Sequence, residues 1–339
     1  MDRVCAMDDT APQAADPRRI GVREVAQAAG VSTQTVSRVI NEHPNIRPET
    51  RDRVLRAIAD LGYRVNNAAR SLGTRTTRTL GVIASDATLY GPAVGIAALE
   101  AAAREAGRWI ATAYADASDE ASVQDAADRL LAQGVDGLIV LAPHATTLTA
   151  LTDAHPAVAI TALHTGSGVE QQEAGAALAV SHLVGLGHRR IGRVAGPDEW
   201  LEARSREAGV LRALAAAGLE PGPRWSGDWT AAAGAESAGE IAVAVRAPGG
   251  PTALAVANDQ MALGLIAALR VAGIDVPGDV SIVGFDDNPD AAYYRPALTT
   301  VGLDLAGEAR RAVAEVLGVP APLPAPPRLV VRASTAVPR

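Results

Sequence analysis

Four side chains in the C-terminal part of the chain are suited to binding a sugar. Arg206, Asn258 and Asp286 offer hydrogen-bond donors and acceptors to hydroxyl groups, and Trp229 offers a flat apolar face to a sugar ring. Apolar pockets with a few convergent polar groups are typical of small-ligand sites. Two of them also have a plainer explanation, because a lone Trp commonly packs in a core and Asn258 suits the start of a helix. Only their joint position after predicted strands favours binding.

The sequence lacks the motifs of common enzyme classes. It contains no G-x-G-x-x-G, G-x-x-x-x-G-K-[ST] or G-x-S-x-G pattern, and no two His are spaced for a zinc-binding helix. The single cysteine, Cys5, excludes an intramolecular disulfide and Cys-based metal sites. Asp286 and Asp287 could hold a metal ion or act as a general base, although a ligand contact or a loop cap is the commoner role. We therefore expect no enzyme activity, no cofactor and no metal.

Basic residues are concentrated near the N-terminus. The 339-residue chain has a formal net charge of −7, and all of its 31 basic residues are Arg. Residues 17–75 contain eleven Arg and five acidic residues, so this segment alone carries a charge of +6. A small basic segment joined to an acidic body predicts a module that meets an anion, with solvated Arg-rich helices as the alternative.

The same segment has the pattern of three short helices. A first amphipathic helix ends at Gly30, a second begins after Ser32, and a third begins at Pro48 and stops at Gly62. Two short helices joined by an Ala-Ala-Gly-Val-Ser turn and covered by a third form a helix-turn-helix arrangement. Residues 1–17 are polar and lack periodicity, so we expect a disordered tail there.

Beyond Arg78, short apolar segments alternate with Ala-rich helical segments. The alternation predicts parallel sheets with helices on both faces, and about 260 residues exceed one hydrophobic core, so we expect two sheets. Ligands of such sheets bind beyond the carboxyl ends of the strands. The predicted strands are 80–84, 109–114, 137–141, 157–161, 191–195, 253–257, 281–285 and 329–331, and the predicted helices are 93–106, 119–132, 170–186, 201–217, 231–245, 260–271 and 305–317.

The segment GVSTQTVSRVIN, residues 30–41, resembles the headpiece of the lac repressor/gal repressor family of bacterial transcription regulators. The similarity extends over nearly the whole chain, from about residue 20 to 337. It implies an all-α helix-turn-helix headpiece followed by an α/β two-lobed core like that of periplasmic binding proteins, with two parallel Rossmann-like sheets. Further segments similar to the family are 50–63, 66–72, 182–183, 187–191, 195–197, 257–264, 283–287 and 298–300.

The resemblance implies a division of the chain into five parts. After the tail at 1–17, the DNA-binding headpiece covers 18–63, and a hinge helix with a linker covers 64–78. The N-terminal effector subdomain consists of 79–162 with 301–327, and the C-terminal effector subdomain consists of 163–300 with 328–339.

The resemblance also assigns DNA contacts, residue by residue. In the hinge helix it implies that Asn66 contacts DNA and that Leu72, with Ala69 beside it, enters the minor groove as a wedge. In the headpiece, Gln suits adenine and Arg suits guanine because each can bond the base edge twice, whereas phosphate contacts position without specifying. The headpiece residues implied to face base edges are Thr33, Gln34 and Arg38, and those implied to contact phosphates are Ser32, Ser37, Asn41 and Arg51.

For the ligand, the resemblance implies a small sugar effector and favours a galactoside. The C-terminal leucine heptads that would form a tetramer are absent from the sequence, so we expect a homodimer. The positions that match the sugar-binding residues of the family are Leu89, Pro92, Arg206, Trp229, Asn258 and Asp286.

These observations predict a cytoplasmic repressor that binds a palindromic operator in double-stranded DNA and is released by a sugar. One alternative is a sugar-binding protein of periplasmic type with no DNA role. The first residues carry no apolar segment of a secretory signal, which opposes this alternative, as does the basic headpiece. Another alternative is a regulator that needs its ligand as a co-repressor. No apolar run reaches the roughly 20 residues of a membrane span.

Overall fold

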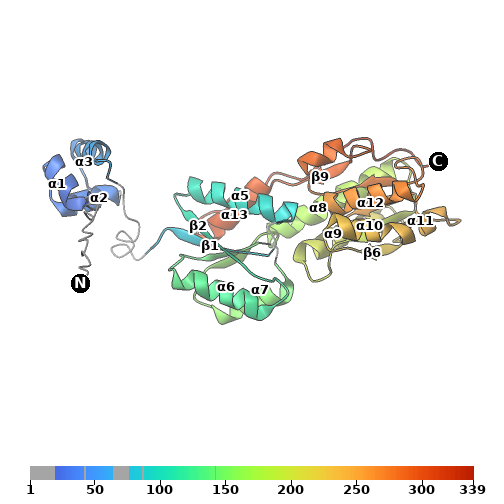
Figure 1. Cartoon of the computed structure of the whole chain (residues 1–339), viewed down its shortest axis with the longest axis horizontal. Coiled ribbons are helices and arrows are strands. Elements are labelled where there is room, and N and C mark those ends of the chain that lie inside the picture. Colours follow the sequence, from blue (N-terminus) through green and yellow to red (C-terminus); the bar gives the residue numbers. More distant parts are fainter. Residues whose placement is uncertain (1–19, 42, 64–75, 86–87, 142) are drawn as a thin grey trace, which may run out of the picture. The chain divides into compact units, whose positions relative to one another are not determined.

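A computed structural model describes residues 20–41, 43–63, 76–85, 88–141 and 143–339. The chain divides into two compact units, Met1–Thr77 and Arg78–Arg339 (Figure 1). Among the described residues, no helix combines the length and the apolar composition that crossing a bilayer requires.

Three helices form the described part of the first unit: α1 (Val22–Ala29), α2 (Thr33–Ile40) and α3 (Pro48–Asp60). α1 ends at Gly30, whose φ of +63° lies in the left-handed region that glycine adopts readily. The three helices enclose Val25, Val36 and Val54, each of which is 0% exposed. The predicted helix-turn-helix arrangement is confirmed.

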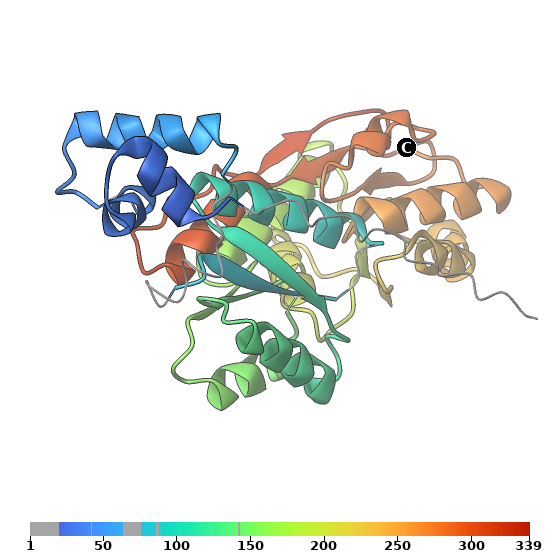
Figure 2. The ribbon, with the colours of Figure 1, turned by 60° about the vertical axis from the view of Figure 1, so that its left-hand side comes forward.

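The first sheet of the second unit has four parallel strands in the order β2-β1-β3-β4. Helices cover both of its faces in Figures 1 and 2, with α5 and α13 on one side and α6 and α7 on the other. The strands are β1 (Thr79–Ala84), β2 (Trp109–Tyr114), β3 (Leu138–Val140) and β4 (Ile160–Ala162), and the helices are α5 (Tyr90–Glu105), α6 (Glu120–Ala132), α7 (Ala145–Ala154) and α13 (Leu305–Val316).

The second sheet repeats this design in the order β6-β5-β7-β8, again with parallel strands. One face packs against α8 and α9, and the other packs against α11 and α12. The strands are β5 (Ile191–Ala195), β6 (Arg224–Ser226), β7 (Ala253–Val256) and β8 (Ser281–Val283), and the helices are α8 (Ser167–Gly185), α9 (Leu201–Ala216), α10 (Ala231–Glu236), α11 (Ala238–Arg246) and α12 (Asp259–Val271).

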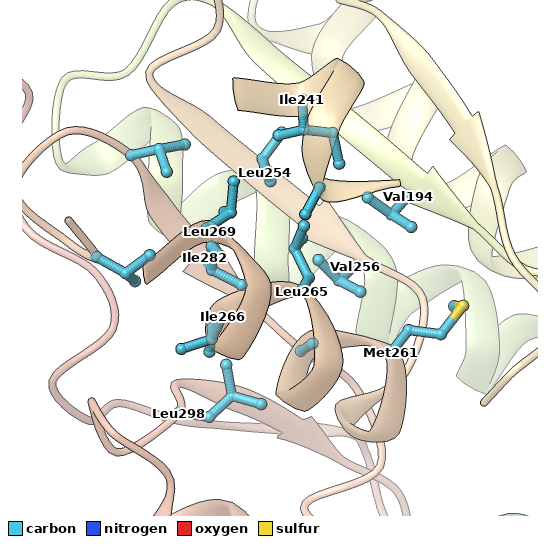
Figure 3. Packing of buried hydrophobic residues seen from close by; sticks show 14 of the residues in the cluster. Val194, Ile241, Leu254, Val256, Met261, Leu265, Ile266, Leu269, Ile282 and Leu298 are labelled. Atoms are coloured by element: carbon cyan, nitrogen blue, oxygen red, sulfur yellow. The ribbon is translucent and has the colours of Figure 1, made fainter. Parts of the chain in front are cut away.

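The core on the α12 side consists of closely packed aliphatic side chains. Figure 3 shows Met261, Leu265 and Leu269 of α12 in one cluster with Leu254 and Val256 of β7. This stripe of α12 repeats every three or four residues, which is the period of a helix with one buried face. Two parallel sheets, each covered on both faces, confirm the predicted fold class.

Several elements differ from the prediction. The strands β6 and β9 (Thr300–Gly302) and the helix α7 were not predicted, and β9 pairs antiparallel with β10 (Arg328–Val330). β6 has the sequence Arg-Trp-Ser and is mostly exposed, and β9 has the sequence Thr-Val-Gly, so neither contains the apolar run that predicts a strand. The predicted helix 231–245 is two helices, α10 and α11, with Ser237 between them. The Ser237 hydroxyl donates to the carbonyls of Ala233 and Gly234, and such bonds bend helices.

Two glycines bring the backbones of α10 and α12 into direct contact. A Cβ atom on Gly264 would lie 1.7 Å from the carbonyl oxygen of Ala231, and one on Gly234 would lie 2.1 Å from that of Met261. Neither position has room for a side chain. The close contact fixes α10, and therefore the loop before it, against the start of α12.

We expect Gly264→Ala to lower the free energy of unfolding by at least about 2 kcal/mol, because the added methyl group overlaps backbone that cannot move aside cheaply. Gly239→Ala is the matched control, since a Cβ on Gly239 meets nothing within 4 Å. Ala is the better helix former, so the control should keep the stability or raise it by up to about 1 kcal/mol. Urea unfolding followed by circular dichroism measures both. Equal stability of the two variants would contradict the tight α10–α12 contact.

Candidate functional sites

The second helix of the headpiece has one buried and one exposed face. Val36 and Val39 are buried against α1 and α3, which turns the opposite side of α2 to solvent. Residues at i, i+1, i+4 and i+5 share that opposite side because of the helical period. The exposed residues at the start and on this side of α2 are Ser32, Thr33, Gln34, Ser37 and Arg38.

Some of the predicted DNA-contacting residues also stabilise the headpiece. The Ser32 hydroxyl caps α2 by accepting a bond of 3.1 Å from the backbone N–H of Thr35. The Asn41 amide donates to the Ser37 hydroxyl, and Arg51 Nη2 donates to the carbonyl of His43 at 3.2 Å.

The side chains of the other predicted DNA-contacting residues in the headpiece have no partner among the described residues. Within the described residues, no hydrogen bond or ion pair involves the side chains of Thr33, Gln34 and Arg38, so these side chains can meet a partner. Their contacts with bases stay a prediction. The predicted hinge residues Asn66, Ala69 and Leu72 lie outside the described residues.

In the second unit, the structure brings all six predicted ligand-binding residues around one pocket. The second unit has two halves, one built around each sheet, and both contribute. Leu89 and Pro92 come from the start of α5, which covers the first sheet, and the others come from segments at the carboxyl ends of β5 to β8 in the second sheet. The pocket is lined by Leu89, Gly91, Pro92, Leu141, His164, Trp200, Glu202, Arg206, Trp229, Asn258, Gln260 and Asp286.

Arg206, on α9, is the most connected side chain of the pocket. Its Nε donates to Gln172 Oε1 at 2.7 Å, its Nη1 donates to the carbonyl of Ala257 at 2.5 Å, and its Nη2 lies 3.1 Å from Asp286 Oδ1. The guanidinium also lies 4.0 Å from the ring centroid of Phe285. Every nitrogen of the guanidinium therefore has a protein partner, and its charge is offset by Asp286.

Asp286 and Asp287 are held by separate cations. Burial raises the pKa of Asp286, while the neighbouring Arg206 opposes the increase. Asp287 Oδ2 accepts from Arg328 and Oδ1 accepts from Arg332, both at 2.8 Å. Within the described residues, no three His, Cys, Asp or Glu side chains lie close enough together to hold a metal ion. These contacts fix both carboxylates, and Asp286 lines the pocket.

Trp229 and Asn258 each line the pocket and also have the structural role that the sequence suggested, core packing for Trp229 and a helix cap for Asn258. Asn258 caps α12, because its Oδ1 accepts from the N–H of Met261, and its Nδ2 donates to the carbonyl of Trp229, both at 2.9 Å. Trp229 is 5% exposed, packs in the core and has a φ of +76°, which few non-glycine residues adopt. Its ring lies over Gly196, where a Cβ atom would overlap it. The indole is thus fixed in place as one wall of the pocket.

Several pocket residues were not predicted. The Trp200 ring stands edge-on to Trp229, with centroids 5.9 Å apart. His164 Nδ1 lies 2.9 Å from Gln172 Nε2, and burial lowers the His164 pKa to about 4, so the imidazole is neutral at pH 7. Glu202 precedes Arg206 by one helical turn, a spacing that places both side chains on one face of α9. This spacing from Arg206 is the feature of the sequence that could have placed Glu202 in the pocket.

Direct contacts join the two halves of the unit at the pocket. Gln260 Oε1, at the start of α12, accepts from the backbone N–H of Tyr90, at the start of α5, at 3.0 Å. On another side, the N–H of Leu201 donates to the carbonyl of Pro143 at 3.2 Å, beside the ring contact between His144 and Trp200. The pocket is therefore bounded by both halves and closed by bonds between them.

Comparison with known proteins finds relatives of both parts of the chain. Residues 22–66 match the family described as bacterial regulatory proteins, lacI family, and residues 180–339 match the periplasmic binding protein-like domain. The lactose operon repressor of Escherichia coli (strain K12) is 35% identical over 296 residues, which are 83% of this chain and 79% of that protein.

Solved structures show the same architecture. The lac repressor dimer bound to operator and the anti-inducer ONPF superimposes with a TM-score of 0.79 at 33% identity, over 94% of this chain and all of the other. The transcriptional regulator CelR in complex with cellobiose has a TM-score of 0.65 at 29% identity, over 93% of this chain and all of the other. With the headpiece, the two-sheet core and these relatives together, the chain belongs to the lacI family of bacterial regulatory proteins.

Proposed function

We propose that this protein is a repressor that binds a near-palindromic operator as a homodimer and is released when a small sugar occupies the pocket. The observation that supports it most strongly is the convergence of six predicted side chains on one pocket that both halves of the second unit build. Membership of a family of DNA-binding regulators favours this function over a sugar-binding protein without a DNA role. The DNA partner places the protein in the cytoplasm.

On the DNA side, the exposed face of α2 supplies the base-reading groups. Gln34 can bond adenine twice through its amide, and Arg38 can bond guanine twice through its guanidinium. Ser37, Asn41 and Arg51 flank this face and serve as phosphate contacts. In the hinge, the resemblance to the family assigns Leu72 the role of a minor-groove wedge, with Ala69 and Asn66 beside it.

On the ligand side, the pocket combines one aromatic wall with few polar groups, as a sugar requires. Leu89 and Pro92 belong to one half, whereas Arg206 and Trp229 belong to the other, so a bound sugar bridges the halves and favours one relative orientation. Sugar and DNA should then oppose each other with a coupling of about 1–3 kcal/mol, the same whichever ligand is added first. A galactoside is our leading choice, because the relatives include the lactose operon repressor.

A co-repressor is the second candidate for the ligand's role. One relative binds cellobiose and another was solved with operator and an anti-inducer, so ligands of different kinds fit this fold. The two candidates differ in the sign of the coupling, which operator titrations with and without sugar determine directly.

We expect Gln34→Ala to weaken binding to an operator selected in vitro by about 1–3 kcal/mol and to relax preference at one or two base pairs. Arg51→Ala should weaken binding to cognate and scrambled DNA alike and reduce the salt slope by about 1, because it loses a phosphate contact. Fluorescence anisotropy at several salt concentrations measures both. Arg104→Ala, which removes an exposed charge from α5, is the control.

Circular dichroism should accompany this test, because Arg51 also holds the carbonyl of His43. If Gln34→Ala and Arg51→Ala lose the same affinity on cognate and scrambled DNA, the assignment of base and phosphate contacts is wrong.

We expect Arg206→Lys to need at least tenfold more sugar to release the operator, while operator affinity without sugar stays within twofold. Lys keeps the charge beside buried Asp286, but it cannot reproduce the planar fork that also reaches Gln172 and Ala257. The measurement is operator affinity across titrations of lactose, methyl β-D-galactopyranoside and cellobiose.

Arg212→Lys is the matched control on the same helix, since Arg212 pairs with Glu173 at an exposed position. Release by Arg206→Lys at the wild-type sugar concentration would remove Arg206 from the ligand contacts. Loss of operator binding in the absence of sugar would show that Arg206 supports the fold instead.

A further inference from the structure

Glu202 is an acidic side chain that lines the pocket without a cationic partner. It is the second residue of α9 and is only 7% exposed. Its own backbone N–H bonds the carboxylate, but Oε2 is buried and has no hydrogen-bond partner among the described residues. Buried acids are normally paired, so an unpaired one in a pocket calls for a ligand.

The neighbouring charges do not satisfy Glu202. Arg206, one turn further along α9, directs its nitrogens to Gln172, Ala257 and Asp286. Asp286 is an acid that pairs with Arg206, and His164 is neutral at pH 7 because burial lowers its pKa to about 4. Among the ionisable groups that line the described pocket, Arg206 and Asp286 pair with each other and His164 is neutral. Glu202 is therefore the one that has no counter-ion and can carry a charge near pH 7.

A second unpaired atom in the same pocket has the opposite hydrogen-bonding character. Trp229 Nε1 is a buried donor with no partner among the described residues, whereas Glu202 Oε2 is a buried acceptor. A hydroxyl group both accepts and donates, so a ligand that carries several hydroxyl groups can satisfy both atoms. An ammonium group can satisfy Glu202 only, and an ether oxygen can satisfy Trp229 only.

We propose that Glu202 determines ligand specificity by accepting a hydrogen bond from a hydroxyl group of the effector, with Trp229 Nε1 donating to an oxygen of the same sugar. The proposal rests on the proposed function and narrows it to neutral, polyhydroxylated sugars. An anionic ligand, such as a uronate or a sugar phosphate, would bring a second negative charge to Glu202 inside a buried pocket. Such ligands should be rejected.

The ionisation of Glu202 adds a pH-dependent readout. Burial raises the Glu202 pKa to about 7, against an opposing effect of Arg206 and with a further increase from Asp286. An ionised carboxylate is the stronger acceptor. Below pH 7 the carboxyl becomes protonated and sugar binding should weaken, up to about tenfold between pH 8 and pH 6. His164 titrates near pH 4, outside this range, and Asp286 is paired with Arg206. Burial and the neighbouring Asp286 raise the pKa of Asp259 to about 8, so only the pH dependence that disappears in Glu202→Gln is assigned to Glu202.

The test is isothermal titration calorimetry of the full chain with lactose, methyl β-D-galactopyranoside and cellobiose as neutral probes. D-galactosamine and D-galacturonate are the cationic and anionic probes. Glu202→Gln keeps the shape but removes the charge, and Glu202→Ala removes the group. We expect both variants to bind the neutral probe at least tenfold more weakly and to lose most of its pH dependence. Galacturonate should bind wild type at least tenfold more weakly than the neutral galactoside.

Glu199→Gln, at an exposed position just before α9, is the control and should match wild type. Operator affinity without sugar should be unchanged in all variants, which shows that they fold. Neutral-probe affinity within twofold of wild type in Glu202→Gln and Glu202→Ala would overturn the inference alone. Tighter binding of galactosamine than of the galactoside would overturn it in favour of an ammonium site. A wild-type chain that binds none of the neutral probes would overturn the proposed sugar effector and this inference together.

Discussion

The ion pair between Arg206 and Asp286 is the interaction on which the pocket depends. It joins α9 to the loop after β8, and the other nitrogens of Arg206 add α8, through Gln172, and the end of β7, through Ala257. A buried ion pair contributes little net stability by itself, because desolvation of both charges offsets their attraction. Its role here is to hold segments in position, since the planar guanidinium of Arg206 fixes four segments around the space that a ligand would fill.

Much of the design could be predicted from the sequence, because it depends on local patterns. The caps at Ser32 and Asn258 and the alternation of strands and helices are each encoded within a few residues. The six pocket residues were found because family motifs and the ends of predicted strands coincide. The partners of Arg206 were not predictable, since Gln172 and Ala257 are 34 and 51 residues away along the chain and meet it only in the folded state.

The unpredicted pocket residues show what local patterns omit. Glu202 and Trp200 lie at the start of α9, where an acid suits the first turn and an aromatic suits a core, so neither breaks a rule of helix formation. The ligand-binding character of Glu202 becomes visible only in the folded structure, where its Oε2 and the Nε1 of Trp229 are buried without partners among the described residues. The same holds for α7, whose Thr-rich segment has weak helical preference and is stabilised by packing against the first sheet.

The close contact of Gly234 and Gly264 has a consequence for the thermodynamics of ligand capture. Because α10 and α12 touch through their backbones, Trp229 before one helix and Asn258 before the other behave as a single rigid wall. That wall is ordered before any ligand arrives, so little conformational entropy is lost there on binding. The start of α5 is tied to the same wall, because Leu89 packs in one core with Trp229 and the Tyr90 N–H donates to Gln260 at the start of α12. A ligand that contacts Trp229 and Asn258 therefore meets a recognition surface that is already in place.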